Sequence, residues 1–300
     1  MQSIKKQAKQ LTYDGHIIWN PWIGCKRISE GCKNCLVYTK LNINSIDEIK
    51  FNKKDFYLPV RKTRIYNETF GKHLLEYKIK PGSIFEVCVD SDFFLEDADY
   101  YRRRAWKIIQ ERSDCLFIIA TKRIDRFLQT IPDTWTKQGW SNVYIKVSVE
   151  NQMYTDYRIQ TLLKLPIKHK GIEIAPILSS IDIRKYLSTG QIDEVIVSGE
   201  ICNSKRLCRL CSFEDVMNIK EQCELYDVKF TFKHTGNYLY KDDKIIHINE
   251  KDGYSLASFY NIDNTNKVFD WKVDSEELED IQRIEQAAII RKKLEIEGLG

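Results

Sequence analysis

Long apolar runs are absent from this 300-residue sequence. No stretch approaches the run of about 20 apolar residues that a membrane-spanning helix needs. The first ten residues, MQSIKKQAKQ, carry basic side chains, but the apolar segment of a secretory signal does not follow them. We therefore expect a cytoplasmic protein that has no contact with a membrane.

Strong net charge, internal repeats and low-complexity tracts are also lacking. The formal net charge is only +4, which by itself neither requires nor excludes a nucleic-acid partner. The absence of repeats and biased tracts argues against a solenoid or a disordered arm. With 43% apolar and 30% charged residues, the composition is that of an ordinary globular chain that can bury a core.

Short β-branched or aromatic runs alternate with amphipathic helical patterns. This alternation is typical of βα units with parallel strands, and it predicts an α/β fold, a partial or closed (β/α) TIM-like barrel or a doubly wound sheet. The expected strands are residues 16–19, 84–89, 116–120, 143–149, 171–175, 194–197 and 229–232. The expected helices are residues 35–41, 97–112, 123–131, 154–165, 181–187 and 213–226.

Two regions fall outside this alternation. Residues 1–240 are expected to form the barrel, with residues 42–80 as an insertion or a cover over the mouth of the site. Residues 241–300 are expected to form a C-terminal extension. It contains a candidate hairpin around Lys241 to Lys244 and a charged terminal helix over residues 275–297, which we interpret as a packing or partner element.

Three cysteines, Cys25, Cys32 and Cys35, follow the first expected strand, separated by six and then two residues. Thiols three positions apart can turn toward one metal centre, and the flanking glycines let the backbone wrap closely around it. Three ligands rather than four are informative, because a four-iron cluster held by three thiolates leaves one iron free to bind another molecule. The alternative is a structural zinc site completed by His16 or by a remote thiol.

The chain has nine cysteines, but its length and the lack of an export signal favour reduced thiols over a disulfide framework. Cys202, Cys208 and Cys211 form a second group after the sixth expected strand. They are candidates for a second metal site, for the fourth ligand of the first site, or for no metal role, which we favour because no glycine supports a wrap there. The other three cysteines are expected to be buried structural thiols: Cys88, Cys115 and Cys223.

Polar residues follow the ends of several expected strands, where α/β folds place their binding sites. Loops are often polar without any function, and this alternative stays open. The candidate site residues at these positions are Asp92, Lys122, Arg123, Glu150, Asn151, Glu200, Lys233 and His234.

Several separate stretches carry a resemblance to a known family. They are Trp19-Asn20-Pro21, Gly24-Cys25, Gly31-Cys32-Lys33-Asn34-Cys35, Ser91-Asp92-Phe93-Phe94, Thr121-Lys122-Arg123, Val147-Ser148-Val149-Glu150-Asn151-Gln152 and Gly199-Glu200 with Arg206. With a three-cysteine loop ahead of repeated βα units, the sequence resembles the radical S-adenosylmethionine (radical SAM) superfamily. The cysteine spacing departs from the commonest one there, and the sequence looks closer to an uncharacterised, phage-associated three-cysteine family related to that superfamily.

The resemblance implies a barrel of the radical-SAM type that binds a four-iron, four-sulfur (4Fe-4S) cluster on Cys25, Cys32 and Cys35. The free iron would hold S-adenosyl-L-methionine, and one electron from a donor would cleave it to a radical that abstracts hydrogen from a substrate. The cofactor-binding residues would then be Asp92, Lys122, Arg123, Glu150, Asn151 and Glu200. The substrate-binding residues would be Arg206, Lys233 and His234.

A nucleotide or nucleic-acid substrate is slightly favoured by a set of basic residues: Arg102, Arg103, Arg104, Lys122, Arg123 and Arg126. The first three are also typical of a solvated helix face. Trp19, Trp22 and Tyr38 are candidates either for stacking on a base or for core packing. The competing hypothesis is a non-enzymatic iron–sulfur or zinc protein of a phage or prophage that binds a protein partner.

Overall fold

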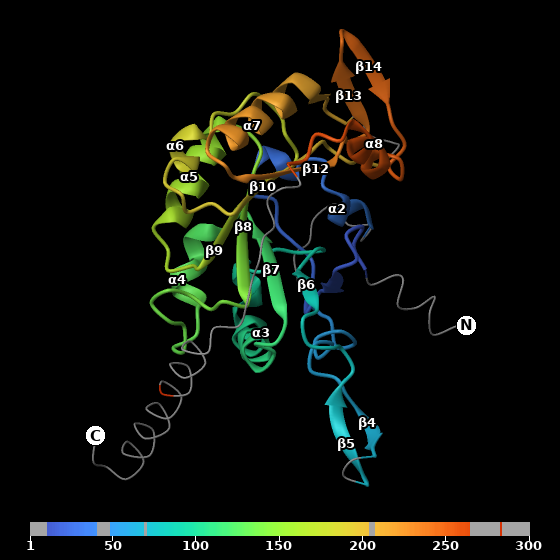
Figure 1. The fold of residues 1–300 in the computed structure, drawn as a ribbon, viewed down its shortest axis with the longest axis vertical. Coiled ribbons are helices and arrows are strands. Elements are labelled where there is room, and N and C mark those ends of the chain that lie inside the picture. Colours follow the sequence, from blue (N-terminus) through green and yellow to red (C-terminus); the bar gives the residue numbers. More distant parts are fainter. Residues whose placement is uncertain (1–10, 41–48, 69–70, 204–207, 265–282, 284–300) are drawn as a thin grey trace.

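The computed structural model describes residues 11–40, 49–68, 71–203, 208–264 and 283. Its centre is a sheet of seven parallel strands that lie side by side in chain order and curl into a half-barrel (Figure 1). The strands are β1 (Ile17–Trp19), β6 (Ile84–Val87), β7 (Leu116–Thr121), β8 (Val143–Val149), β9 (His169–Ile174), β10 (Glu194–Ser198) and β12 (Lys229–His234). All seven coincide with strands expected from the sequence, and the α/β fold with parallel strands is confirmed.

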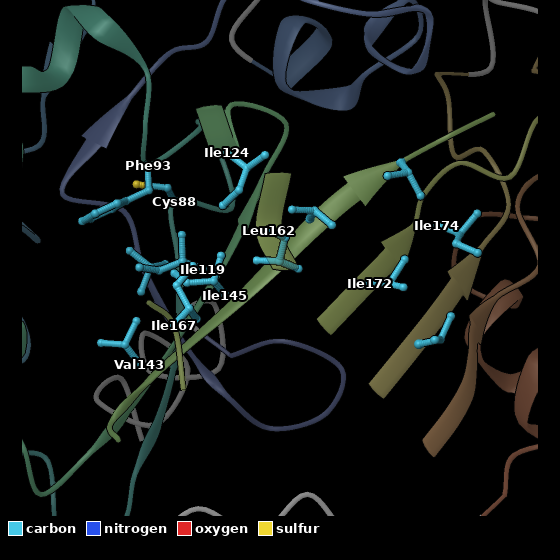
Figure 2. Close-up of a cluster of buried hydrophobic side chains, with 14 of the residues drawn as sticks. Cys88, Phe93, Ile119, Ile124, Val143, Ile145, Leu162, Ile167, Ile172 and Ile174 are labelled. Atoms are coloured by element: carbon cyan, nitrogen blue, oxygen red, sulfur yellow. The ribbon is translucent and has the colours of Figure 1, made fainter. Parts of the chain in front are cut away.

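The core lies between the convex face of this sheet and the helices that connect its strands. Strands β7, β8 and β9 are rich in β-branched residues, which suit a sheet that is buried on both faces. Figure 2 shows part of the core, with Ile119, Ile145 and Ile172 on these three strands and Leu162 from the helical side. Each of these four side chains is fully buried.

The helices that cover the convex face are formed by the expected amphipathic segments. The longer ones are α3 (Asp99–Glu111), α5 (Gln152–Leu163) and α7 (Phe213–Leu225), and the shorter ones are α4 (Phe127–Thr130) and α6 (Arg184–Leu187). Helix α2 (Leu36–Lys40) lies instead at the carboxyl ends of the strands. Helix α4 begins later than expected, because the backbone of Arg123 is not helical and Ile124–Arg126 form a 3-10 turn. Among the described residues, no helix is long and apolar enough to cross a membrane.

Smaller sheets surround the half-barrel. β2 (Trp22–Ile23) pairs with β3 (Lys50–Phe51), and β4 (Lys62–Asn67) forms a hairpin with β5 (Lys72–Tyr77). β11 (Cys211–Ser212), β13 (Tyr238–Lys241) and β14 (Lys244–His247) form a third sheet, next to α8 (Gly253–Tyr260). The hairpin expected around Lys241 to Lys244 is confirmed, whereas the helix expected over residues 275–297 lies, apart from the single residue Arg283, outside the described residues.

The concave side of the sheet, which we call the lumen, contains charged side chains. Lys233 of β12 lies 3.8 Å from Glu86 of β6, and these strands are not neighbours in the sheet, so the two side chains meet across the lumen. Lys146 of β8 lies 3.7 Å from Glu173 of β9. Burial alone would raise the pKa of Glu86, but Lys146, His16 and Lys233 outweigh it and hold that pKa well below its usual range.

The open side of the half-barrel is bridged by contacts between side chains. β1 and β12 form the two edges of the sheet and do not pair with each other. Lys233 of β12 forms an ion pair with Asp14, just before β1, at 3.3 Å. Above it, the ring of Tyr13 stacks on Tyr254 of α8 with their centres 4.5 Å apart. Residues 11–16 therefore connect the two edges through side chains.

Replacing Glu86 by Gln should lower the free energy of unfolding at pH 7 by about 3 kcal/mol, because two lumen lysines lose their counter-ion. The folded state holds the Glu86 pKa down, so this stability is present above the unfolded value of about 4.3 and is lost as the pH falls further. Urea unfolding at pH 7 and at pH 3 measures this stability. The difference in the free energy of unfolding between wild type and variant should be smaller at pH 3 than at pH 7. The exposed control E221Q should change neither value; a gap of equal size at both pH values would contradict the prediction.

Candidate functional site

A cavity of about 570 Å³ opens at the carboxyl ends of the parallel strands. Cys25, Cys32 and Cys35 all line it, and so do the lumen residues Glu86 and Lys233. The three cysteines expected to bind a metal are therefore brought to one cavity, which continues into the charged lumen.

The loop that carries these thiols, residues 24–35, is called the cysteine loop below. It lies between β2 and α2, and both of its ends are tied down. Ser91 donates its hydroxyl hydrogen bond to Gly24 O at the start of the loop. Tyr38 of α2 donates its hydroxyl to Cys25 O at 2.8 Å, and the Arg27 guanidinium lies 3.7 Å from the centre of the Tyr38 ring.

Two of the three thiols have raised pKa values. Burial, with a smaller contribution from the Asp92 carboxylate, raises the pKa of Cys25 to about 12. Burial also raises the pKa of Cys35. Nη1 of Arg123 lies 4.0 Å from Sγ of Cys25, so a cation stands next to this sulfur when a metal displaces its proton.

A buried carboxylate after β6 holds the first part of the cysteine loop. Asp92 accepts hydrogen bonds from Thr121 Oγ1 at 2.8 Å and from Lys122 N at 3.0 Å, at the end of β7. It also accepts from Arg123 Nη1 at 3.1 Å, and Arg123 Nη2 donates to Lys26 O at 2.6 Å. Asp92 thus joins two strand ends and orients Arg123 toward Cys25.

A second buried carboxylate, Glu150 after β8, lies beneath the middle of the loop. It accepts hydrogen bonds from Gly31 N at 3.4 Å, from Lys122 Nζ at 3.1 Å and from Arg158 Nη1 at 2.9 Å. Burial would raise the pKa of Glu150, but Lys122 and Arg158 lower it overall. A side chain at Gly31 would bring its Cβ to 3.1 Å from Glu150 Cδ, so this close approach leaves little room for any residue larger than glycine.

A third carboxylate, Glu200 after β10, holds the end of the loop. It accepts from Asn34 Nδ2 at 2.8 Å, and Asn34 stands between Cys32 and Cys35. Arg209 donates its backbone N–H to Glu200 at 2.9 Å and also forms an ion pair with it. Burial opposes ionisation of Glu200, yet the Arg209 hydrogen bonds keep its pKa below the usual value.

The predicted cofactor residues therefore fall into two groups. Asp92, Lys122, Arg123 and Glu200 line the cavity together with the cysteines. Glu150 is fully buried and supports the loop without lining the cavity. Asn151 has a structural role instead: its Oδ1 accepts from Tyr154 N at 3.1 Å and caps the start of α5.

The predicted substrate residues also differ among themselves. Lys233 and His234 line the cavity, and Arg206 lies outside the described residues. Both ring nitrogens of His234 are engaged, because Nδ1 accepts from Gly236 N at 2.8 Å and Nε2 lies 3.0 Å from Glu250 O. Burial lowers the His234 pKa, so this neutral ring serves packing, and Lys233 is left as the charged group of the pair.

The sequence analysis missed Cys88 as a residue of the cavity. It follows β6, is buried as expected for a structural thiol, and lines the cavity beside the cysteine loop. Its φ of 59° lies in the left-handed region, which is uncommon for a non-glycine residue and clusters at functional sites. Cys88 lies within the strand expected over residues 84–89, where a buried structural thiol was the natural expectation, so the sequence offered no signal for it. Tyr254, which also lines the cavity, had no signal either.

Other expectations are resolved by burial and bonding. Trp19 and Trp22 are fully buried core residues and do not stack on a ligand. Cys202 and Cys208 form a disulfide, which removes both thiols as metal ligands in this state. No described residue between 49 and 80 lines the cavity.

A zinc site completed by His16 is not preformed. In the described part of the chain, the only group of three or more potential ligand atoms within 4.8 Å of one another belongs to Asp14, His16 and Glu86. His16 Nδ1 lies 3.2 Å from Glu86, away from the cysteines, and the Lys233 ammonium already lies close to both carboxylates of this group. The three cysteine sulfurs do not form such a compact group.

Replacing Glu200 by Gln should loosen the end of the cysteine loop, because the ion pair with Arg209 is lost. We expect the free energy of unfolding to fall by about 1 to 3 kcal/mol and Cys32 and Cys35 to react several-fold faster with a maleimide. Peptide mass spectrometry of the labelled metal-free protein measures this rate, with buried Cys223 as an internal reference. The exposed control E214Q should leave the rate unchanged. Equal labelling of both variants would show that Glu200 does not hold the loop.

Comparison with curated proteins and with solved structures found no match. Residues 12–287 match a family model described as "Protein of unknown function (DUF5131)". Because this match covers well over half of the chain, the protein belongs to the DUF5131 family.

Proposed function

We propose that the protein is a radical-SAM-like enzyme, which holds a 4Fe-4S cluster on Cys25, Cys32 and Cys35 and acts on a substrate in the adjoining cavity. The observation that carries this proposal is the convergence of the three thiols on one cavity at the carboxyl edge of a parallel half-barrel. This edge is where α/β barrels hold their reactive groups.

The three sulfurs are not preformed as a compact zinc site. Tetrahedral zinc with bonds of about 2.3 Å brings its thiolates to about 3.8 Å from one another. The three sulfurs of the cysteine loop do not all lie within 4.8 Å of one another. Arg123, next to Cys25, supplies positive charge for the thiolates.

When bound, the cluster supplies the electron that cleaves S-adenosyl-L-methionine to a 5′-deoxyadenosyl radical. The residues of this chain position the molecules around that chemistry. Lys122 and Arg123 offer cations to the methionine carboxylate, and Glu200 offers a carboxylate to its amino group. All three line the cavity beside the thiols, and hydrogen bonds with Glu150, Asp92 and Arg209, respectively, keep them in place before any ligand arrives.

The substrate would lie deeper, toward the lumen. Lys233 reaches the cavity from β12 with its ammonium held by Asp14 and Glu86. This end of the cavity offers both charge signs beside the stacked rings of Tyr13 and Tyr254, which suits a polar molecule with an apolar part such as a nucleotide. The electron donor would be a separate protein.

Anaerobic reconstitution with iron and sulfide should yield about four of each per chain and a brown protein with broad visible absorbance. C32S should lose this cluster, because two thiolates cannot hold it. The matched control C208S should retain it, since Cys208 is tied to Cys202 and lies outside the cavity. Zinc in place of iron and sulfide, bound by the same three cysteines, would overturn the proposal and favour a non-enzymatic metal-binding protein.

The enzymatic part has its own test. The reconstituted protein, reduced with dithionite in the presence of S-adenosyl-L-methionine, should release 5′-deoxyadenosine, measured by liquid chromatography and mass spectrometry. K122M should retain the cluster but form the nucleoside about tenfold more slowly, because a cation at the cofactor is lost. If the protein with a complete cluster yields no 5′-deoxyadenosine, the proposed metal centre is retained and the proposed reaction is excluded.

A further inference from the structure

The solvent face of α3 carries a strip of cations outside the candidate site. Arg103, Arg104 and Lys107 are exposed along this helix, and Tyr100 on the same face is 84% exposed. Arg102, in contrast, is buried and donates to Phe93 O, so it belongs to the core and is no part of the strip. The basic set expected from the sequence is therefore split between the core, the cavity and this outer face.

The β4–β5 hairpin carries a second set of cations. It projects from the half-barrel at the end away from the β13–β14 sheet (Figure 1). The register pairs Lys62 with Tyr77, Arg64 with Leu75 and Tyr66 with His73, and these alternate residues share one face. Tyr66 and Leu75 are 56% and 66% exposed on that face.

The two cationic elements are joined rigidly. The Tyr77 hydroxyl, on the same face of the hairpin, donates to Glu111 at the end of α3 at 2.8 Å. Arg112, the next residue, lies 4.3 Å from the centre of the Tyr77 ring and donates to Ile79 O at 2.9 Å and to Pro59 O. Fully buried Arg112 thus clamps the base of the hairpin to the helix.

We propose that the outer face of α3 and this face of the β4–β5 hairpin together bind the backbone of double-stranded DNA. The contact cations are Lys62, Arg64, Arg103, Arg104 and Lys107. Within the described residues, none of these five forms an ion pair, so their charge is available to phosphates. Glu111 is engaged by Tyr77, and Glu76 belongs to the opposite face of the hairpin.

The dimensions of the surface suit a duplex. Helix α3 has 13 residues and each hairpin strand has six, which gives about 20 Å for each element at about 1.5 and 3.4 Å per residue. The five cations occupy part of each element. Arg103 lies about 12 Å from Glu111 along α3, and Arg64 lies about 7 Å beyond Lys62 along β4, so together they cover about 20 Å, roughly half a turn of B-DNA. A two-stranded ribbon also has the width that the major groove admits.

The chemistry favours a nucleic acid over a protein. The contact cations form no ion pair within the described residues, which favours a polyanion. Tyrosine hydroxyls, such as those of the exposed Tyr66 and Tyr100, are among the groups that bind phosphate oxygens. This inference does not depend on the iron–sulfur cluster. The surface would bring DNA to the protein whatever reaction takes place in the cavity.

The test is fluorescence anisotropy of the full-length protein with a labelled DNA duplex of two helical turns, over a range of salt concentrations. R103Q/R104Q/K107Q should weaken binding about tenfold or more at low salt, and the plot of log affinity against log salt should become shallower by about 2 to 3. The hairpin variant K62Q/R64Q should weaken binding with a salt slope shallower by about 1 to 2.

The control K137Q/K164Q/K251Q removes three exposed lysines from other elements. It has the same net charge as the α3 variant and should bind within about twofold of wild type. Equal losses in this control and in the α3 variant would show that binding follows overall charge, and would overturn the proposal. The proposal would also be overturned if only one of the two variants, R103Q/R104Q/K107Q or K62Q/R64Q, weakened DNA binding. Tighter binding to single-stranded DNA or to RNA than to the duplex would overturn it as well.

Discussion

Three buried carboxylates hold the cysteine loop on the strand ends, and the geometry of the cavity depends on them. Asp92, Glu150 and Glu200 follow β6, β8 and β10, which are alternate strands of the half-barrel. Burial of an ionised carboxylate is costly unless it is paired and fully hydrogen-bonded. Each of the three meets this condition with an arginine or lysine. Glu150 and Glu200 also accept a hydrogen bond from the loop itself, whereas Asp92 reaches the loop through Arg123. The loop is therefore positioned by interactions that fail together if the strand ends move.

These hydrogen bonds show which role each polar residue at the strand ends has. The sequence indicates that such residues gather at one edge of a parallel sheet, and the structure brings them together. It cannot indicate which of them bind one another. The carboxylate oxygens of Glu150 accept hydrogen bonds from Gly31, Lys122 and Arg158, so its role is to position the loop that carries the thiols. Asn151, one position further, only caps a helix. Side-chain partners from distant strands decide these roles, and spacing along the chain does not contain them.

The seven strands were predictable because β-branched runs bounded by polar residues leave little choice of structure. The β4–β5 hairpin was not predictable in the same way. Its strands alternate basic, aromatic and aliphatic residues with no buried face, so no hydrophobic period marks them. It is held instead by Arg112, a residue at the end of a helix distant in sequence. The same limit applies to Cys88, whose left-handed backbone is fixed by tertiary contacts.

The clamp on the cysteine loop also sets an order of events during synthesis. Asn34 and its partner Glu200 are 166 positions apart in the chain. At about 5 to 20 residues per second, a ribosome needs on the order of ten to thirty seconds to add the residues between them. During most of this interval the three thiols have left the ribosome while the carboxylate that secures them has not been made. A nascent chain of this protein thus exposes reactive sulfur long before its half-barrel can enclose it.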